Sequence, residues 1–310
     1  MCPNWGNIPV ETMKSPRRQI MNKARRPGWE RSSQPGQATT CTLFCRLGST
    51  QAGQSKEKQA FSLLSCHTKS ILLGSLLGDG SLKINKGYKN ARFSFRHSIK
   101  QKEYFLFKRN ILHKSISAPK DMWEQTQGTD WQPHKLRYQS RALVSLSYLY
   151  HITHKGSSSG KIRIRRTWLN LMDAQALAIW WCDDGSLVAN TKQGVFCTDG
   201  FSYQDVKILD AYMKKVWGIS TAVHPVGKGR TGHYRLWIRS VTDLKIFLRI
   251  IMPHIPVFSM LYKVLILYKD SGLQQRWISE IADNTAFARA DIERLAAERK
   301  SKLAAFQKMI

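Results

Sequence analysis

Two apolar segments that end in the same short motif constrain the fold of this chain more than any other feature. Residues 71–78 lead into Asp79-Gly80-Ser81, and residues 174–182 lead into Asp183-Asp184-Gly185-Ser186. Apolar stretches of this length that stop at a glycine are typical of buried helices, and we expect Gly80 to end the first one. Asp79 and Asp184 are 105 residues apart (184 − 79). The spacing predicts two copies of one half, each about 100 residues long.

Similar elements follow both motifs. After the first, apolar residues at 91, 93 and 95 alternate with Arg or Ser at 92, 94 and 96, which predicts a strand with one apolar and one basic face. A helix is expected over residues 100–113. After the second motif we expect a strand near 195–198, a helix opened by Ser202, a hairpin around 227–232, and helices over 241–252 and 259–269. The order of elements therefore repeats along the chain.

The charge balance indicates a polyanionic partner. Lys and Arg number 49 against 21 Asp and Glu, a net charge of +28. A hydrophobic content of 42% with 10 Trp predicts a globular fold. The most apolar stretch, residues 246–267, is interrupted by Arg249, Lys263 and two prolines, so we expect no membrane span. The 6 cysteines form no Cys-x-x-Cys pair, which favours reduced thiols.

Four segments are expected from these patterns. Residues 1–65 have few acids and no sustained periodicity, and we predict a basic, poorly ordered extension that is either an organelle transit peptide or a fused leader. Residues 66–172 and 173–275 are the two predicted halves. Residues 276–310 are predicted to form a charged helical tail at the surface.

The two motif carboxylates are the best candidates for a metal site. The motif helices could pack side by side, because Gly74 and Gly78 lie one turn apart on the first helix and allow close approach. Helix C-termini are negative, so Asp79 and Asp184 there would attract a divalent cation. We place the preceding residues of the motifs, Gly78 and Asp183, in the same site. A single Asp-Gly after an apolar run is usually a simple helix stop, and only the repetition argues for chemistry.

The second motif, Trp180-Trp181-Cys182-Asp183-Asp184-Gly185, resembles that of the LAGLIDADG homing endonucleases. Written against the nine-letter motif, the first copy is residues 72–80 and the second residues 177–185. Residues 201–206, 255–256 and 259–263 also resemble this family, and the resemblance covers about residues 68–270.

The resemblance implies an α+β fold of two pseudo-symmetric αββαββα halves, with the motif helices packed at their interface and the sheets forming a DNA-binding saddle. It implies a monomer that cleaves both strands of a long DNA target with magnesium, two or three ions lying near Asp79 and Asp184. It also implies an intron-encoded protein of a mitochondrion or chloroplast. The second copy has Ile179 and Asp183 where the first has Gly74 and Gly78, so we expect an asymmetric helix contact and an asymmetric target.

The resemblance further implies a set of residues that organise the catalytic water. The polar residue that ends the second strand is His97, with Asp199 as its counterpart by the helix register. Lys161 and Lys263 are the candidates for the late lysine of each half. A histidine at a strand end can equally be a solvated edge residue, and a given lysine is more often solvated or a phosphate contact.

The polar strand faces and the hairpin tips are the expected DNA contacts. A face of alternating charges can also be merely exposed, which is the plainer interpretation. The candidates are Lys83, Lys86, Lys89, Arg92, Ser94, Arg96, Thr198, Lys228, Arg230, Arg235, Trp237 and Arg239.

Two other functions stay open at this stage. Proteins of this fold can act as intron maturases, which bind the host intron RNA and assist splicing, with or without nuclease activity. The presence of both Asp79 and Asp184 favours a live nuclease. A basic architectural protein without catalysis would explain the charge but not the repeated motif.

Overall fold

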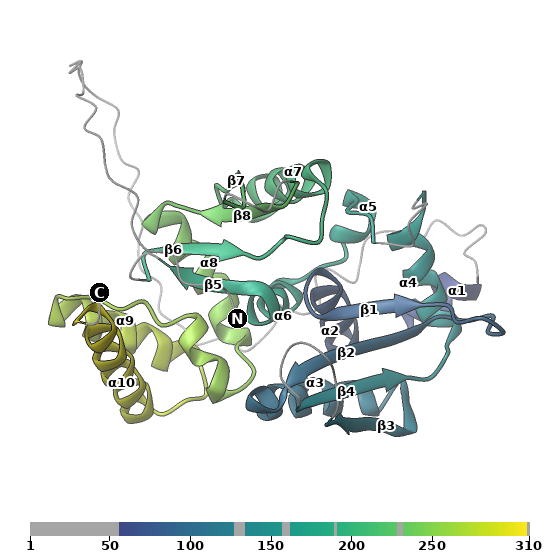
Figure 1. The fold of residues 1–310 in the computed structure, drawn as a ribbon, viewed down its shortest axis with the longest axis horizontal. Coiled ribbons are helices and arrows are strands. Elements are labelled where there is room, and N and C mark those ends of the chain that lie inside the picture. The colour runs from purple at the N-terminus through teal and green to yellow at the C-terminus, as the bar shows by residue number, and fades with distance from the viewer. Residues whose placement is uncertain (1–55, 127–133, 157–161, 189–190, 228–231, 309–310) are drawn as a thin grey trace, which may run out of the picture. The chain divides into compact units, whose positions relative to one another are not determined.

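The computed structural model describes residues 56–126, 134–156, 162–188, 191–227 and 232–308 (Figure 1). Three predicted site residues, Lys161, Lys228 and Arg230, lie outside the described residues. Residues 1–55, most of the segment predicted to be poorly ordered, lie outside them as well.

The two motif helices, α2 (Cys66–Leu77) and α6 (Ala174–Asp184), pack against each other at the centre of the described fold (Figure 1). Each begins at a side-chain cap: Ser65 accepts a hydrogen bond from the Thr68 backbone N–H, and Asp173 accepts one from Ala176. Asp173 also accepts a hydrogen bond from the Ser70 hydroxyl at 2.7 Å, which ties the start of one helix to the other.

The first half follows the order αββαββα, as predicted. Helix α2 leads into β1 (Gly80–Lys83) and β2 (Arg92–Ser98), then α3 (Lys102–His113), β3 (Ser117–Gln125), β4 (Lys135–Ser140) and α4 (Val144–His154). The four strands form an antiparallel sheet in the order β1-β2-β4-β3. A short 3-10 turn, η1 (Ile99–Gln101), joins β2 to α3.

The second half repeats this topology. Helix α6 is followed by β5 (Gly185–Val188), β6 (Gln193–Phe196), α7 (Tyr203–Tyr212), β7 (Ala222–Pro225), β8 (Tyr234–Ile238) and α8 (Val241–Ile251). Its sheet has the equivalent order β5-β6-β8-β7. A π-helical turn, η2 (Met213–Trp217), extends α7 and ends at Gly218 in the left-handed conformation, with φ 69°. The α+β fold of two αββαββα halves is therefore confirmed.

The remaining elements join the halves or follow them. Helix α5 (Arg166–Leu169) lies between the halves, and η3 (Met252–His254) and η4 (Phe258–Lys263) follow α8. The predicted helix over residues 259–269 is wrong, since only the 3-10 turn η4 forms there. Helices α9 (Ser271–Asn284) and α10 (Arg289–Lys308) end the chain.

Two predicted segment boundaries are wrong in detail. Helix α1 (Lys56–Ser62) lies inside the segment that was predicted to be poorly ordered, and its Phe61 ring packs on Tyr148. Helix α9 crosses the predicted boundary at residues 275/276. It is not a surface helix throughout, because Trp277 and Ile281 are buried in the core. In both cases a few apolar contacts decide the structure of a segment whose composition is mostly polar.

The core lies on one face of each sheet. Strand pairing sets Phe95 opposite Gly80 in the first sheet and Phe196 opposite Gly185 in the second, and both rings are buried. Trp180 and Trp181 of α6 contact the Phe196 ring, at centroid distances of 4.0 and 5.0 Å. Because side chains alternate along a strand, the residues between these aromatics point to the opposite face. Each half thus leaves one polar sheet face free of its own core.

Among the described residues no single helix is long and apolar enough to cross a membrane, although α1 and α2, bent by 108°, pass a length and composition test as a pair. The three described cysteines, Cys66, Cys182 and Cys197, are free thiols.

Candidate active site

The first motif helix ends two residues earlier than the sequence suggested. Gly78, not Gly80, is its C-cap, and the Gly78 N–H donates a hydrogen bond to the Ser75 carbonyl at 3.0 Å. Gly78 lies against Asp183, and a Cβ at that position would collide with the Asp183 side chain. Gly74 is pressed in the same way against Ala176 and Ile179. The predicted close packing through Gly74 and Gly78 is therefore confirmed.

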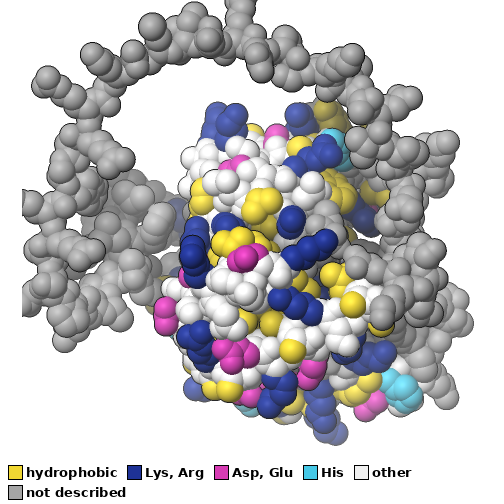
Figure 2. Space-filling view, turned by 90° about the vertical axis from the view of Figure 1, so that its left-hand side faces the viewer, with side chains coloured by type: hydrophobic (Ala, Val, Ile, Leu, Met, Phe, Trp, Pro, Cys, Tyr) yellow, Lys and Arg dark blue, Asp and Glu magenta, His cyan; other side chains and the backbone are white. Residues whose placement is uncertain are grey.

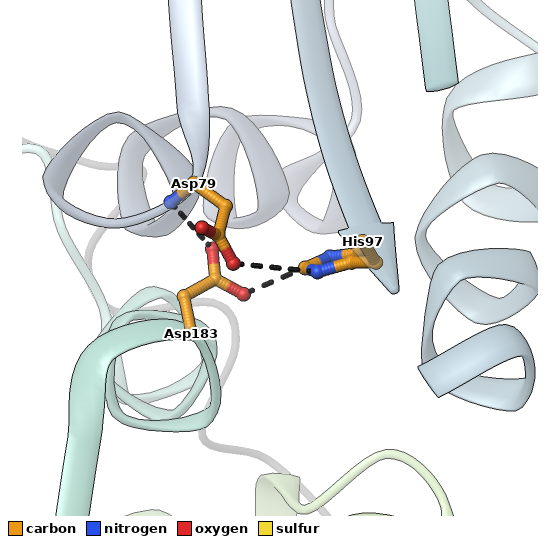
Figure 3. Close-up of side chains that lie close together, drawn as sticks. All are labelled: Asp79, His97 and Asp183. Carbon is orange, nitrogen blue, oxygen red and sulfur yellow. Dashed lines mark hydrogen bonds and ion pairs between the residues drawn. The ribbon is translucent and has the colours of Figure 1, made fainter. Parts of the chain in front are cut away.

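Three side chains meet where the motif helices end (Figure 3). Asp79 follows α2, Asp183 lies in the last turn of α6, and His97 comes from the end of β2. Nδ1 of His97 lies 3.3 Å from Oδ2 of Asp79, and the Asp79 N–H donates to Oδ2 of Asp183 at 3.3 Å. Potential ligand atoms of the three residues all lie within 4.8 Å of one another. His97 is buried, so the structure brings it to the motif carboxylate as predicted.

Asp183 is already fully hydrogen bonded within the protein. Lys108 of α3 donates to both of its carboxylate oxygens, at 3.0 and 3.1 Å, and the Tyr104 hydroxyl donates to Oδ1 at 2.8 Å. The side chains of Asp183 and Lys108 have no exposed surface. A carboxylate with this many donors has little free capacity for a metal. Asp183 was predicted as a metal ligand, but its contacts make it a structural link between the halves.

Asp184 is in the opposite situation. Burial, together with the nearby negative charges of Asp79 and Asp183, raises the pKa of the Asp184 carboxyl to about 8, and the positive charge of Lys263 opposes this shift. Burial would raise the pKa of Asp79 too, but the hydrogen bond and charge of His97, with Lys108 and Lys263, bring it below the ordinary value. The site therefore has one carboxylate with a lowered pKa and one whose pKa stays raised although Lys263 opposes the shift.

This donor set fits a divalent cation. Magnesium and calcium prefer hard oxygen ligands, and a cation beside Asp79 would add positive charge to that of Lys263 and favour the ionised form of Asp184. Asp79 keeps a side chain that is 40% exposed and so is open to solvent. Asp79 and Asp184 are the residues that would hold the ion.

Lys263 lies beside this pair, as predicted. Its Nζ donates to the Gly185 carbonyl at 2.5 Å, and its own carbonyl accepts a hydrogen bond from Trp181 Nε1 at 2.8 Å. The side chain is buried, so it is not a solvated lysine. Its positive charge acts on both Asp79 and Asp184.

The counterpart of His97 is Thr198, not Asp199. The strand pairs Gly80–Phe95 and Gly185–Phe196 are equivalent, so residue 97 corresponds to residue 198. The prediction aligned the helices that follow these strands, which placed the counterpart of His97 one residue too far along the chain. Thr198 is fully buried and donates to the Tyr234 carbonyl at 2.7 Å, so its predicted DNA contact is wrong. Asp199 instead holds Arg235 through two hydrogen bonds of 2.8 Å.

The polar face of the first sheet is strongly basic. Strand pairing places two like-charged pairs directly opposite each other, Lys83 with Arg92 and Arg96 with Arg137. Lys135 is on the same face, opposite Ser98. Like charges in direct opposition destabilise a sheet unless a counter-charge lies against them. This face contains four of the predicted DNA contacts, Lys83, Arg92, Ser94 and Arg96. It also contains Lys135 and Arg137, which the sequence patterns had not indicated.

The polar face of the second sheet carries fewer free charges. Arg235 is paired with Asp199, and Arg239 lies 3.3 Å from His224 through Nη1 and Nε2. Trp237 is half-buried between Val195 and Ala222 in the strand register. Arg235, Trp237 and Arg239 therefore share a face as predicted, but this face is more neutral than the first.

One other side of the molecule carries side chains of both charges (Figure 2). On the side of the molecule that faces the viewer in Figure 2, Lys and Arg side chains alternate with acidic and apolar ones. Several cations of the C-terminal helices are paired, as in Arg249 with Glu280 and Arg294 with Asp291. The predicted tip residues Lys86 and Lys89 are exposed at the β1–β2 turn, beside the basic sheet face.

A family model described as the LAGLIDADG DNA endonuclease family matches residues 69–245. The chain belongs to this family. The match begins within α2 and ends within α8, so it contains both motif helices and both sheets.

Two curated proteins are similar to this chain in sequence. Protein RecA of Mycolicibacterium chitae is 26% identical over 214 residues, which cover 65% of this chain and 47% of that protein. Cytochrome b mRNA maturase bI2 of Saccharomyces cerevisiae is 26% identical over 210 residues, 65% of this chain and 48% of the maturase. The chain spans about half the length of these curated relatives.

A solved structure shares the fold. The homing endonuclease I-WcaI bound to its DNA recognition sequence superposes with a TM-score of 0.57 at 21% identity, covering 71% of this chain and 96% of that one. The two-half architecture of the LAGLIDADG endonucleases is thereby confirmed for this chain.

Proposed function

We propose that this chain is a site-specific DNA endonuclease that makes a magnesium-dependent double-strand break in a long target. The observation that carries the proposal is the position of Asp79 and Asp184, which lie where the two motif helices end, with a like-charged, basic sheet face in the first half. Cross-strand arginine and lysine pairs are costly in the free protein and favourable against phosphates. Membership in a DNA endonuclease family supports the same conclusion.

The residues of the site and of the basic sheet face have different roles in the proposed cleavage. Asp79 and Asp184 would hold magnesium, which when bound lowers the pKa of a water and neutralises the charge developing on the phosphodiester. His97 orients the Asp79 carboxylate through Nδ1. Lys263 sets a buried positive charge beside both carboxylates. The basic sheet face binds the DNA backbone and sets affinity and salt dependence.

The experiment uses the full chain with magnesium and two probes. One is a pool of duplexes with a randomised central region, and the other is the duplex that joins the sequences on either side of the reading frame. The wild type should release double-strand ends at a defined sequence. Asp79→Asn and Asp184→Asn should keep DNA affinity measured in calcium and lose cleavage, whereas Asp283→Asn on the exposed face of α9 should cut like the wild type. Full cleavage by either motif variant would reject the proposal.

A second candidate function is that of an intron maturase. It is favoured by the similarity to cytochrome b mRNA maturase bI2 and by the net charge of +28. Its test is splicing of the intron that encloses the reading frame, with and without the protein. Stimulation that persists in Asp79→Asn and Asp184→Asn would assign an RNA role that is independent of the metal site.

We further propose that the protein is encoded by an organelle intron and acts as a monomer on DNA. The internal repeat supports the monomer, because one chain already contains both motif helices. The DNA that flanks the reading frame tests the first part, since a mitochondrial or chloroplast gene interrupted at this point is expected. Light scattering of the DNA complex tests the second.

A further inference from the structure

The first half contains a buried lysine at a position where the second half has a leucine. The buried residues of α3 are Tyr104, Phe105, Lys108 and Leu112, and those at the same spacing in α7 and η2 are Asp205, Val206, Leu209 and Met213. Lys108 thus corresponds to Leu209, by the same offset that relates His97 to Thr198. His97 and Lys108 therefore correspond to Thr198 and Leu209, which carry no ionisable group.

Lys108 is enclosed by protein on every side and is not a phosphate contact. Its Nζ donates to both oxygens of Asp183 and lies 4.6 and 5.1 Å from the ring centroids of Phe95 and Tyr104. The side chain has no exposed surface. A buried ammonium is tolerated only with such pairing. Asp183 comes from the second half, so the ion pair also links the two halves.

The third contact of Lys108 determines where His97 carries its proton. Nζ of Lys108 lies 3.2 Å from Nε2 of His97. An ammonium group can only donate, so Nε2 must accept, and the proton of the neutral ring is then on Nδ1. Nδ1 is the atom that lies 3.3 Å from Oδ2 of Asp79. Although the two atoms do not meet hydrogen-bond geometry, a protonated Nδ1 sets its polar N–H beside the carboxylate and cannot itself ligate a metal.

We propose that Lys108 is a positioning residue for the first-half centre: it holds His97 as the Nδ1–H tautomer that orients Asp79, and it occupies Asp183 so that Asp184 is left for the metal. The cluster of Asp79, His97 and Asp183 is accordingly a hydrogen-bonded support and not a three-ligand metal cage. In the second half Thr198 donates to a backbone carbonyl and Leu209 is apolar. The two centres are unequal, and the two DNA strands depend on Lys108 to different extents.

The first test needs no DNA and no metal. Protein labelled with ¹⁵N-histidine gives ring ¹⁵N–¹H correlations that separate the two tautomers, and His97→Gln identifies the His97 signals. The wild type should show Nδ1–H, and Lys108→Met should shift His97 toward the Nε2–H form. Lys102→Met, which removes an exposed charge from the same helix, should leave the spectrum unchanged. The proposal would be overturned if His97 were the Nε2–H tautomer in the wild type, or if Lys108→Met left the His97 tautomer unchanged.

A second variant covers the case in which Lys108→Met does not fold. Lys108→Met combined with Asp183→Asn removes both charges of the buried pair and is expected to fold. It should show the same tautomer change, whereas Asp183→Asn alone, which retains the ammonium, should keep Nδ1–H. If His97 has the same tautomer in the double variant and in the wild type, the role of Lys108 is also rejected.

The second test rests on the proposed nuclease function and follows each strand of a supercoiled plasmid that carries the selected target. Lys108→Met should slow one strand by about 10²-fold, as expected for a misplaced catalytic group, so that nicked plasmid accumulates. Leu209→Met should cut both strands at the wild-type rates. A wild type that does not cut rejects the nuclease and leaves the tautomer test standing. A wild type that cuts, with Lys108→Met equally fast on both strands, rejects the positioning role alone.

Discussion

The two halves share a topology but differ in the chemistry that they bring to the centre. The first half contributes His97 and Lys108, and the equivalent positions of the second half hold Thr198 and Leu209. The polar face of the first sheet carries directly opposed cations, whereas Arg235 of the second is neutralised by Asp199. The comparison teaches that the αββαββα framework tolerates exchange of its buried polar residues while the motif Asp of each half stays in place.

The largest expected effect comes from breaking the buried ion pair whose lysine, Lys108, has no charged equivalent in the second half. Lys108→Met leaves the Asp183 carboxylate buried without its cation and should lower the free energy of unfolding by about 3–5 kcal/mol. Leu209→Met at the equivalent position should cost less than about 1.5 kcal/mol. Urea unfolding followed by circular dichroism measures both. Equal losses in the two variants would contradict the proposed difference between the halves.

A smaller loss is expected at the contact between the motif helices. Gly74→Ala places a Cβ against the Ala176 carbonyl and Ile179, and overpacking of this kind costs about 1–3 kcal/mol. Gly200→Ala is the matched control, because no atom lies within 4 Å of the added Cβ. If both variants melt at the wild-type temperature, the helices are not packed as closely as described.

The pH dependence of stability should reveal the raised pKa of Asp184. Its pKa is about 8 in the folded protein against 3.8 for the ordinary group, so the folded state retains a proton that the unfolded state releases. A raised pKa contributes stability that is present below pH 4 and is lost as pH rises through 8. Each unit by which the folded pKa exceeds the unfolded one corresponds to about 1.4 kcal/mol of stability lost between these limits. Asp184→Asn should abolish this part of the slope in metal-free thermal melts, and calcium should reduce it.

The smallest effect concerns the salt dependence of DNA binding. Each phosphate contact contributes about 0.9 to the slope of log K against log salt concentration. Arg96→Gln with Arg137→Gln should therefore lower the slope by about 2. Arg235→Gln should change it by less, since Asp199 already neutralises this guanidinium. Fluorescence anisotropy with calcium measures the slope. Equal changes in slope from variants of the two sheets would contradict the proposed difference in charge between the sheet faces.

Much of the site follows from local pattern. The repeated Asp-Gly-Ser motif located Asp79 and Asp184, and strand alternation placed Phe95 in the core with His97 on the same side. The apolar stripe of α3 contained a signal that was overlooked: Lys108 lies in register with buried Tyr104 and Phe105. A charged residue on a buried face must have a partner, and that rule could have singled it out.

The rest depended on contacts between distant segments. The equivalence of His97 and Thr198 comes from strand pairing, since the first hairpin separates Gly80 from Phe95 by 15 residues (95 − 80) and the second separates Gly185 from Phe196 by 11 (196 − 185). An alignment of the helices alone does not reveal this difference in hairpin length. The order of the strands and the burial of Trp277 in α9 likewise rest on packing between segments.

The sequence by itself determined the duplication, the helices that stop at Asp79 and Asp184, and the basic strand faces, because periodicity and glycine position act locally. Only the tertiary structure decided the roles of the adjacent carboxylates Asp183 and Asp184. They share a helix turn, but Asp183 is paired with the Lys108 ammonium of the other half, whereas burial and two neighbouring carboxylates keep the pKa of Asp184 raised. Their protonation and their capacity for metal are set by neighbours distant in the chain, and the electrostatics of a buried group depends on all of them together.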